Sequence, residues 1–305
     1  MRTANEYYRM RFGGKVYRIS LNGGMTCPNR DGTLGLSGCI FCSRGGSGDF
    51  APSATLPIAE QLTIAKKKIA GKLPKRKDSF AGYLAYFQAF TNTYAPVSYL
   101  RRIFNEALSD PEVVGLSVAT RPDCLAPECI LLLAELNKRK PVYVELGLQT
   151  IHEKTADFIR RGYPLSVYDD AVLRLQAAGI PVITHVILGL PSESPEDMTA
   201  TVKHVVNAGV HGIKLQLLHI LADTDLADYY VNASPSEFAC MTLDSYTEIL
   251  CSVLALIPDE TVVYRITGDG PKRTLIAPLW SADKKAVLNA LNRQIERSIP
   301  CSQKC

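Results

Sequence analysis

The sequence lacks the features of a membrane or exported protein. None of its 305 residues fall in a run of roughly 18 consecutive apolar residues, the length that a membrane span requires. The first residues, MRTANEYYRMRFGG, are charged and aromatic and contain no apolar core of an export signal. We therefore expect a cytoplasmic protein that does not contact a membrane.

Histidine is scarce, and the cysteines cannot all pair with one another. The chain has 5 histidines, none before His152, and 9 cysteines, an odd number. In a chain without an export signal, such cysteines indicate a reducing compartment in which thiols bind metals or act in catalysis rather than forming disulfides.

The net charge is also small, with a formal value of only +4. This value does not by itself identify a nucleic-acid-binding protein. The basic residues are nevertheless uneven, because seven of them fall between positions 66 and 77: Lys66, Lys67, Lys68, Lys72, Lys75, Arg76 and Lys77. Such a run is typical of a solvated helix face, and a surface that faces RNA is the alternative.

Short apolar runs alternate with longer segments of helical periodicity, the pattern of βα units around a parallel sheet. Residues from about 225 onward lose this alternation, which predicts a core in residues 1–224 and a helical C-terminal extension in residues 225–305 that packs on its open side. The six expected core strands are Val16–Leu21, Gly82–Phe87, Gly115–Ala119, Val142–Leu148, Val182–Leu188 and Ile213–Leu218, and Thr261–Ile266 is a candidate later strand.

Three cysteines share one loop, residues 23–46, after the first expected strand. Eleven residues separate Cys27 from Cys39, and two separate Cys39 from Cys42. Active sites of βα barrels lie on such loops, and three thiolates can hold an iron-sulfur cluster that keeps one iron open. Structural zinc, which requires a fourth protein ligand, and unrelated thiols are the alternatives.

Five segments together resemble the YhcC/YtqA-type radical S-adenosylmethionine (radical SAM) proteins, within the group that includes the Elongator catalytic subunit and the oxygen-independent coproporphyrinogen oxidases. They are the cysteine loop, Tyr86–Tyr94, Ala119–Leu125, Glu145–Thr150 and Gly189–Pro191. The first cysteine spacing is longer than the commonest radical SAM pattern and matches this subgroup. The resemblance implies an incomplete (β/α)6 TIM-like barrel of the radical SAM type with a C-terminal helical extension.

The resemblance also implies two cofactors, a [4Fe-4S] cluster and S-adenosyl-L-methionine. It makes Cys27, Cys39 and Cys42 the ligands of the cluster and places Phe41 against the adenine of the bound cofactor. The segment from Gln88 to Thr93, including Thr91, would surround the cofactor's amino acid portion, although the family's usual glycine-rich sequence is absent there.

Other cofactor contacts follow from the same resemblance. Gln149 and Arg161 match a pair that holds the ribose and carboxylate of the cofactor, with Arg160 as an adjacent competitor. Glu145 could bind cofactor or substrate, or form a buried pair with a lysine.

Three further residues are candidates at the ends of later strands. His185 occupies a ribose-contacting position, Gly189 opens a turn where backbone can approach the adenine, and His219 is a candidate substrate or cofactor contact. Each histidine could equally be an ordinary core residue. The terminal Cys301 and Cys305 could support a second metal, but a frayed terminus is the simpler interpretation.

The resemblance implies reductive cleavage of S-adenosylmethionine and removal of hydrogen from a substrate, expected to be the side chain of a wobble uridine in tRNA. An electron donor such as flavodoxin or ferredoxin would be the partner. The sequence identifies no catalytic residue. A radical enzyme on a small molecule or peptide and a non-radical iron-sulfur electron carrier are the alternative functions.

Overall fold

The computed structural model describes residues 1–74, 79–268 and 270–298. The expectations for Lys75, Arg76 and Lys77, and for Cys301 and Cys305, lie outside these residues. Within the described part of the chain, no helix is long and apolar enough to span a membrane.

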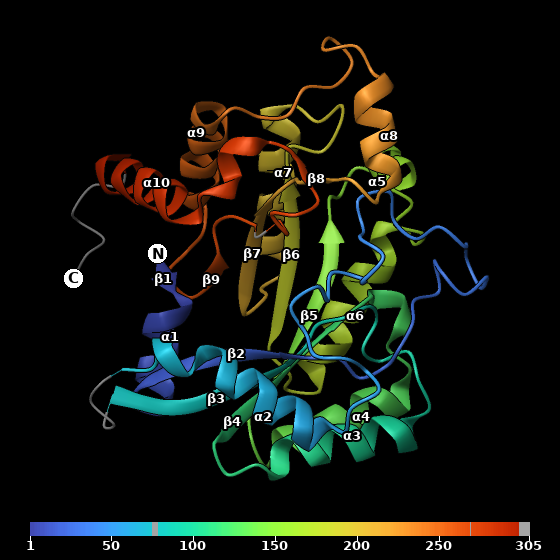
Figure 1. The fold of residues 1–305 in the computed structure, drawn as a ribbon, viewed down its shortest axis with the longest axis vertical. Coiled ribbons are helices and arrows are strands. Elements are labelled where there is room, and N and C mark those ends of the chain that lie inside the picture. The colour runs from blue at the N-terminus through green and yellow to red at the C-terminus, as the bar shows by residue number, and fades with distance from the viewer. Residues whose placement is uncertain (75–78, 269, 299–305) are drawn as a thin grey trace.

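The core is a curled parallel sheet, which confirms the predicted incomplete barrel (Figure 1). Among the described residues its eight strands run in the order β1-β9-β7-β6-β5-β4-β3-β2. Their bounds are β1 Arg2–Thr3, β2 Lys15–Leu21, β3 Phe80–Phe87, β4 Val113–Thr120, β5 Val142–Gln149, β6 Val182–Leu188, β7 Gly212–Leu217 and β9 Val262–Arg265. The six expected core strands are β2 to β7, and the candidate later strand is β9.

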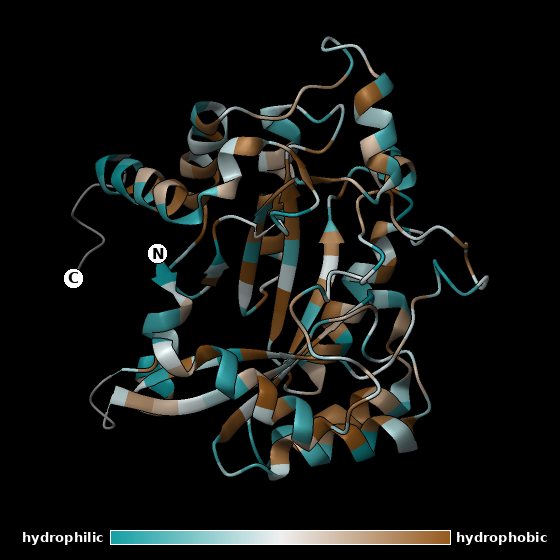
Figure 2. Cartoon of the chain, viewed as in Figure 1, coloured by the Kyte–Doolittle hydropathy of each residue, from teal (hydrophilic) through white to brown (hydrophobic). Residues whose placement is uncertain are grey.

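Helices connect the strands, and most of them cover the convex face of the sheet, while α1 lies at its amino-terminal end (Figure 1). They are α1 Ala4–Phe12, α2 Ile58–Ile69, α3 Val97–Ser109, α4 Pro127–Asn137, α5 Glu153–Phe158, α6 Leu165–Ala177 and α7 Pro195–Asn207. Figure 2 shows apolar residues concentrated in the strands, while apolar and polar residues alternate along the helices. In α7, for example, Ser194 caps the first turn through the backbone N–H of Asp197, and Met198, Val202 and Val205 are buried.

The C-terminal part contains α8 Asp225–Asn232, α9 Leu243–Leu254 and α10 Lys284–Ser298, together with the small antiparallel pair of β8 Ile220–Leu221 and β10 Leu275–Ala277. It is not purely helical, because β9 pairs in parallel with β7 of the main sheet. Residues 225–305, which we expected to form a helical extension, therefore also contribute a strand to the barrel.

The amino-terminal end of the barrel is filled by aromatic side chains. Tyr8 of α1 packs edge-on against Tyr143 of β5 and Tyr264 of β9, at ring-centroid distances of 6.4 and 5.9 Å. These residues belong to one buried apolar cluster that also contains Leu84 and Ile183. The carboxyl ends of the strands are left for the functional site.

Candidate functional site

A cavity of about 690 Å³ lies inside the curved sheet, toward the carboxyl ends of its strands. Its wall includes Cys27, Cys39 and Cys42. Six of the seven residues expected to bind the cofactor also line it: Phe41, Gln88, Thr91, Gln149, Arg161 and His185. The seventh, Gly189, is not among its lining residues.

The cysteine loop is folded around Arg30. The Arg30 guanidinium donates from Nη2 to the carbonyl oxygens of Cys42 (2.9 Å) and Ser43 (2.8 Å). Gly38 has a φ of 77°, and a Cβ at this position would lie only 2.7 Å from Arg30 Nε. The loop therefore needs glycine here, because the arginine fills the space that a side chain would occupy.

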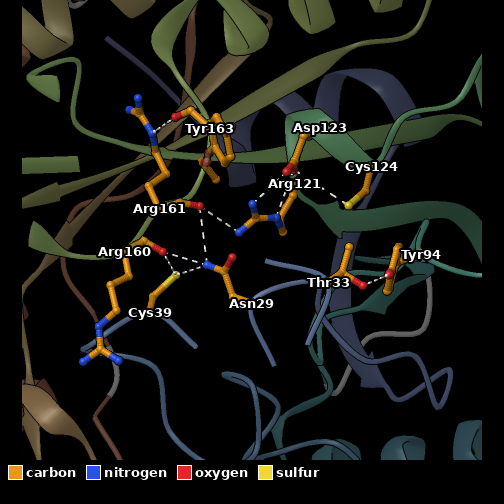
Figure 3. Close-up of polar contacts among 11 residues, drawn as sticks. Asn29, Thr33, Cys39, Tyr94, Arg121, Asp123, Cys124, Arg160, Arg161 and Tyr163 are labelled. Carbon is orange, nitrogen blue, oxygen red and sulfur yellow. Dashed lines mark hydrogen bonds and ion pairs between the residues drawn. The ribbon is translucent and has the colours of Figure 1, made fainter. Parts of the chain in front are cut away.

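The same loop is tied to the barrel by hydrogen bonds to the end of α5 (Figure 3). Asn29 Nδ2 donates to the carbonyl oxygen of Arg160 at 2.7 Å and lies 3.5 Å from Cys39 Sγ. Arg121 Nη1 donates to the carbonyl oxygen of Arg161 at 2.9 Å, while its other nitrogens form a two-bond ion pair with Asp123. Asn29 thus ties the loop to the segment after α5, and Arg121 ties that segment to the end of β4.

The chemistry of the donor set fits an iron-sulfur cluster. Among the described residues, no three His, Cys, Asp or Glu side chains converge on a position that a single metal ion could occupy. A four-iron cluster takes one thiolate at each iron that it binds, so its ligands need not converge. Burial raises the pKa of the Cys39 thiol to about 12, opposed by the charge of Arg121. Metal binding would replace that proton, since the thiolate is the ligand form.

Gln88 and Thr91 connect the ends of the first strands to the cysteine loop. Gln88 Oε1 accepts from Ser20 at 2.9 Å, and its Nε2 donates to the carbonyl oxygen of Ser47 at 2.7 Å. The backbone N–H of Thr91 donates to the carbonyl oxygen of Thr26 at 3.2 Å. Phe41 packs against an apolar cluster that includes Ile187 and Leu218 of the opposite wall.

Gln149 and Arg161 both line the cavity, and protein atoms already contact both. Gln149 has a φ of 67°, a left-handed conformation that is rare for this residue type and that recurs at functional sites. The guanidinium of Arg161 is fully buried and donates to the carbonyl oxygens of Thr150 (2.6 Å) and Tyr163 (2.9 Å) and to Glu153 (3.0 Å). Arg160 instead pairs with Asp225, away from these contacts.

The other two candidates lie at different places. Gly189 has a φ of 87°, its N–H lies 3.1 Å from the sulfur of Met198, and a Cβ would meet Met241. His219 lines the cavity, packed so closely that a Cβ on Gly268 would lie 2.5 Å from its ring.

Charged side chains from neighbouring strands form the deep end of the cavity, centred on Glu145 of β5. One carboxylate oxygen accepts from Ser117 at 2.5 Å and lies 3.5 Å from Arg18. The other accepts from Lys214 of β7 and, at 2.7 Å, from His185 of β6. Although burial opposes it, Lys214 and Arg18 hold the pKa of Glu145 well below its usual range. Glu145 therefore both lines the cavity and forms the lysine pair considered from the sequence.

A chain of hydrogen bonds extends from this carboxylate to the last strand. Gln216 Nε2 donates to His185 Nδ1 at 3.3 Å, and Arg265 Nη1 donates to Gln216 Oε1 at 3.4 Å. His185 thus accepts at Nδ1 and donates at Nε2, the neutral form. Burial, together with Lys214, lowers its pKa to about 4, which agrees with that form.

Four residues at or beside the deep end of the cavity were not predicted from the sequence: Arg18, Lys214, Gln216 and Arg265. A signal was present, because each sits inside an apolar strand segment such as VYRISL or GIKLQL, where a polar side chain has no solvent to face. A strand side chain of this kind points into a core or a cavity, and several together indicate a cavity.

Family models match most of the chain. The radical SAM superfamily matches residues 26–205, and the radical SAM C-terminal domain matches residues 210–297. YtqA of Bacillus subtilis is 45% identical over 294 residues, which cover 96% of this chain and 89% of that protein. YhcC of Escherichia coli is 37% identical over 286 residues, which cover 93% and 89%.

More distant similarities extend to the Elongator group. Elongator complex protein 3 of Schizosaccharomyces pombe is 24% identical over 197 residues, which cover 63% of this chain and 35% of that protein. The structure of an archaeal Elp3 from Methanocaldococcus infernus superposes with a TM-score of 0.68 at 16% identity, covering 93% of this chain and 63% of that one. At this identity the likeness concerns the fold. The chain spans less than two thirds of either protein.

Proposed function

We propose, because the chain belongs to the radical SAM superfamily, that it cleaves S-adenosylmethionine reductively and removes hydrogen from the side chain of a wobble uridine in tRNA. The observation that carries the proposal is the placement of Cys27, Cys39 and Cys42 on one loop, on the wall of one cavity at the carboxyl ends of a parallel sheet.

In this proposal the three cysteines hold a [4Fe-4S] cluster, and Phe41, Gln88, Thr91 and Gln149 surround S-adenosylmethionine. When bound, the two groups supply a one-electron cleavage whose product takes a hydrogen atom from the substrate. The chain's own residues position and enclose these groups. Arg30 and Arg121 place positive charge beside the cysteine loop, which favours an anionic cluster with thiolate ligands.

Arg161 has a narrower role than the resemblance implies. Three of its guanidinium bonds are made to Thr150, Tyr163 and Glu153, so it also fixes the segment after β5. We retain it as a cofactor contact through its remaining N–H groups, since it lines the cavity.

The choice of tRNA is supported by similarity to Elongator complex protein 3 and by basic residues on the cavity wall. Lys72, from the basic run, lines the cavity. Lys66, in contrast, bonds to Asp110 at 2.7 Å and to Glu112 at 2.8 Å, which leaves it less available to a phosphate. A flavodoxin or ferredoxin would supply the electron.

The test is anaerobic reconstitution with iron and sulfide, followed by dithionite, S-adenosylmethionine and bulk tRNA lacking wobble modifications. We expect methionine and 5′-deoxyadenosine as products, with tRNA changing both their yield and its own nucleoside composition. Cleavage without any effect on tRNA would point to a small-molecule or peptide substrate. A reduced cluster without cleavage would point to an electron carrier.

A further inference from the structure

The deep end of the cavity carries more positive than negative charge, and the proposed function does not use it. Arg18, Glu145, His185, Gln216 and Arg265 all line this end. Two carboxylates are among the described lining residues: Asp49 contacts Ser43 beside the cysteine loop, and Glu145 lies at the deep end, which two guanidinium groups also line. Lys214 is left out of this count because it pairs with Glu145 and is not itself among the lining residues.

Glu145 has no capacity left for a further cation. One of its oxygens contacts Ser117 and Arg18, and the other contacts His185 and Lys214. A carboxylate has about four lone-pair positions, so these four neighbours satisfy it. The second guanidinium, that of Arg265, must find its counter-charge elsewhere.

Arg265 lacks such a counter-charge within the described part of the chain. No carboxylate there forms an ion pair with it, and its hydrogen bond is the 3.4 Å contact from Nη1 to Gln216. A guanidinium carries five N–H donors, and one held in a protein cavity without an anion loses much of its hydration. An anion bound there would compensate for the lost hydration through charge-assisted hydrogen bonds.

We propose, building on the proposed function, that Arg265 and Arg18 form a subsite at the deep end of the cavity that binds a carboxylate or phosphate group of the substrate. The Gln216–His185 pair is its support, because Gln216 Oε1 fixes the Arg265 guanidinium and His185 fixes Gln216. A planar guanidinium can bind either anion through two parallel bonds. The rest of the substrate then extends toward the cysteine loop.

The subsite makes Arg265 a specificity-determining residue. A substrate without the anion would leave the Arg265 guanidinium without a counter-charge from the described part of the chain. A site that holds such a group discriminates against ligands that leave it without a partner.

The experiment is a calorimetric titration of the reconstituted protein with acetate and, separately, with inorganic phosphate, in saturating S-adenosylmethionine and at constant ionic strength. The variants are Arg265→Gln, which removes the charge, and Arg265→Lys, which keeps the charge but not the planar fork. Arg102→Gln is the matched control, because Arg102 is exposed on the outer helix α3.

We expect the parent and Arg102→Gln to bind at least one anion equally well. Arg265→Gln should weaken that binding on the order of tenfold or more, as expected for a hydrogen bond to a charged group, and Arg265→Lys should weaken it less. A preference for acetate identifies a carboxylate, and a preference for phosphate identifies a phosphate. If Arg265→Gln does not fold, the change in anion affinity of Arg265→Lys alone tests the proposal.

The proposal is overturned if the parent binds neither anion, or if both Arg265 variants bind the anions like the parent. It is also overturned if the parent binds an anion only when S-adenosylmethionine is absent. The last result would assign the subsite to the cofactor. Cofactor cleavage is measured on the same preparations after reduction. Its failure in a parent that binds the anion would contradict the proposed function and leave the subsite standing.

Discussion

The imidazole of His185 meets the carboxylate of Glu145 across neighbouring strands, with Nε2 2.7 Å from Oε2. This contact links the buried ion pair of β5 and β7 to the hydrogen bonds that reach Arg265 on β9. Because His185 is neutral, the contact transmits orientation without adding charge to the cavity. His185 therefore joins the side chains of Glu145 on β5 and Gln216 on β7.

Replacing Cys27, Cys39 or Cys42 singly with alanine should abolish assembly of a normal four-iron cluster, because each would supply one of three ligands. The measurements are the iron content and the visible absorption of the anaerobically reconstituted protein. Cys251→Ala on α9 and Cys124→Ala are the controls and should retain the full cluster. Loss of metal in Cys124→Ala, with zinc bound by the parent, would instead support a four-ligand zinc site.

Glu145→Gln should destabilise the fold by about 3–5 kcal/mol, the range for removing one partner of a buried ion pair. The change leaves Lys214 and Arg18 without their shared counter-charge. Denaturant unfolding of the protein measures the effect. Adding Lys214→Met should recover part of the loss, and a double variant no more stable than Glu145→Gln would argue against this ionic explanation.

Stability should fall as the pH is lowered from about 6.5 toward 4. His211 directly precedes β7, and its Nε2 lies 2.9 Å from the hydroxyl of Tyr264. Burial lowers the pKa of both His185 and His211 from 6.5 to about 4. Each therefore binds fewer protons in the folded state than in the unfolded state, so their contribution is complete above pH 6.5 and is lost as the pH falls. The slope should reach at most about 1.4 kcal/mol per pH unit for each histidine.

Unfolding free energies measured between pH 7.5 and 5 test this prediction. This pH interval lies above the usual pKa values of most carboxyl groups. His185→Gln and His211→Gln should each reduce the slope. An unchanged slope in both variants would show that neither histidine is the source.

Asn29→Ala should weaken retention of the cluster even though Asn29 is not a ligand. The change removes the bonds from Nδ2 to the Arg160 and Arg161 carbonyl oxygens and leaves them without this donor, at a cost of about 1–3 kcal/mol. Faster loss of iron to a chelator is the readout. Thr33→Ala, which removes an exposed 3.0 Å contact to Tyr94 in the same loop, is the control and should behave like the parent.

Arg161→Ala should lower both S-adenosylmethionine affinity and stability. The affinity loss is expected at roughly 1.5–3 kcal/mol, as for a charge-assisted hydrogen bond, and the stability loss follows from the three bonds that its guanidinium makes. Calorimetry and denaturant unfolding separate the two effects. Arg160→Ala should change cofactor affinity little. A larger loss of cofactor affinity in Arg160→Ala than in Arg161→Ala would assign the contact to Arg160.

The barrel was predictable because buried parallel strands leave a clear apolar pattern, from Val16–Leu21 to Val182–Leu188. Strand β1 was not, because two residues carry no periodicity. In the site, the cysteine spacing identified the loop. The partners of Arg265 could not be read from the sequence, since they depend on how β9 pairs with β7, where the register shifts between Ile213 and Lys214.

The bonds from Asn29 and Arg121 to the carbonyl oxygens of Arg160 and Arg161 also bear on biogenesis. Asn29 and its partner Arg160 are separated by 131 positions in the chain, so a nascent polypeptide must extend beyond α5 before these bonds can form. Contacts between such distant residues form late, because closing a long loop has a high entropic cost. A cluster loop held by these bonds therefore requires that the chain from β1 to α5 has already been made.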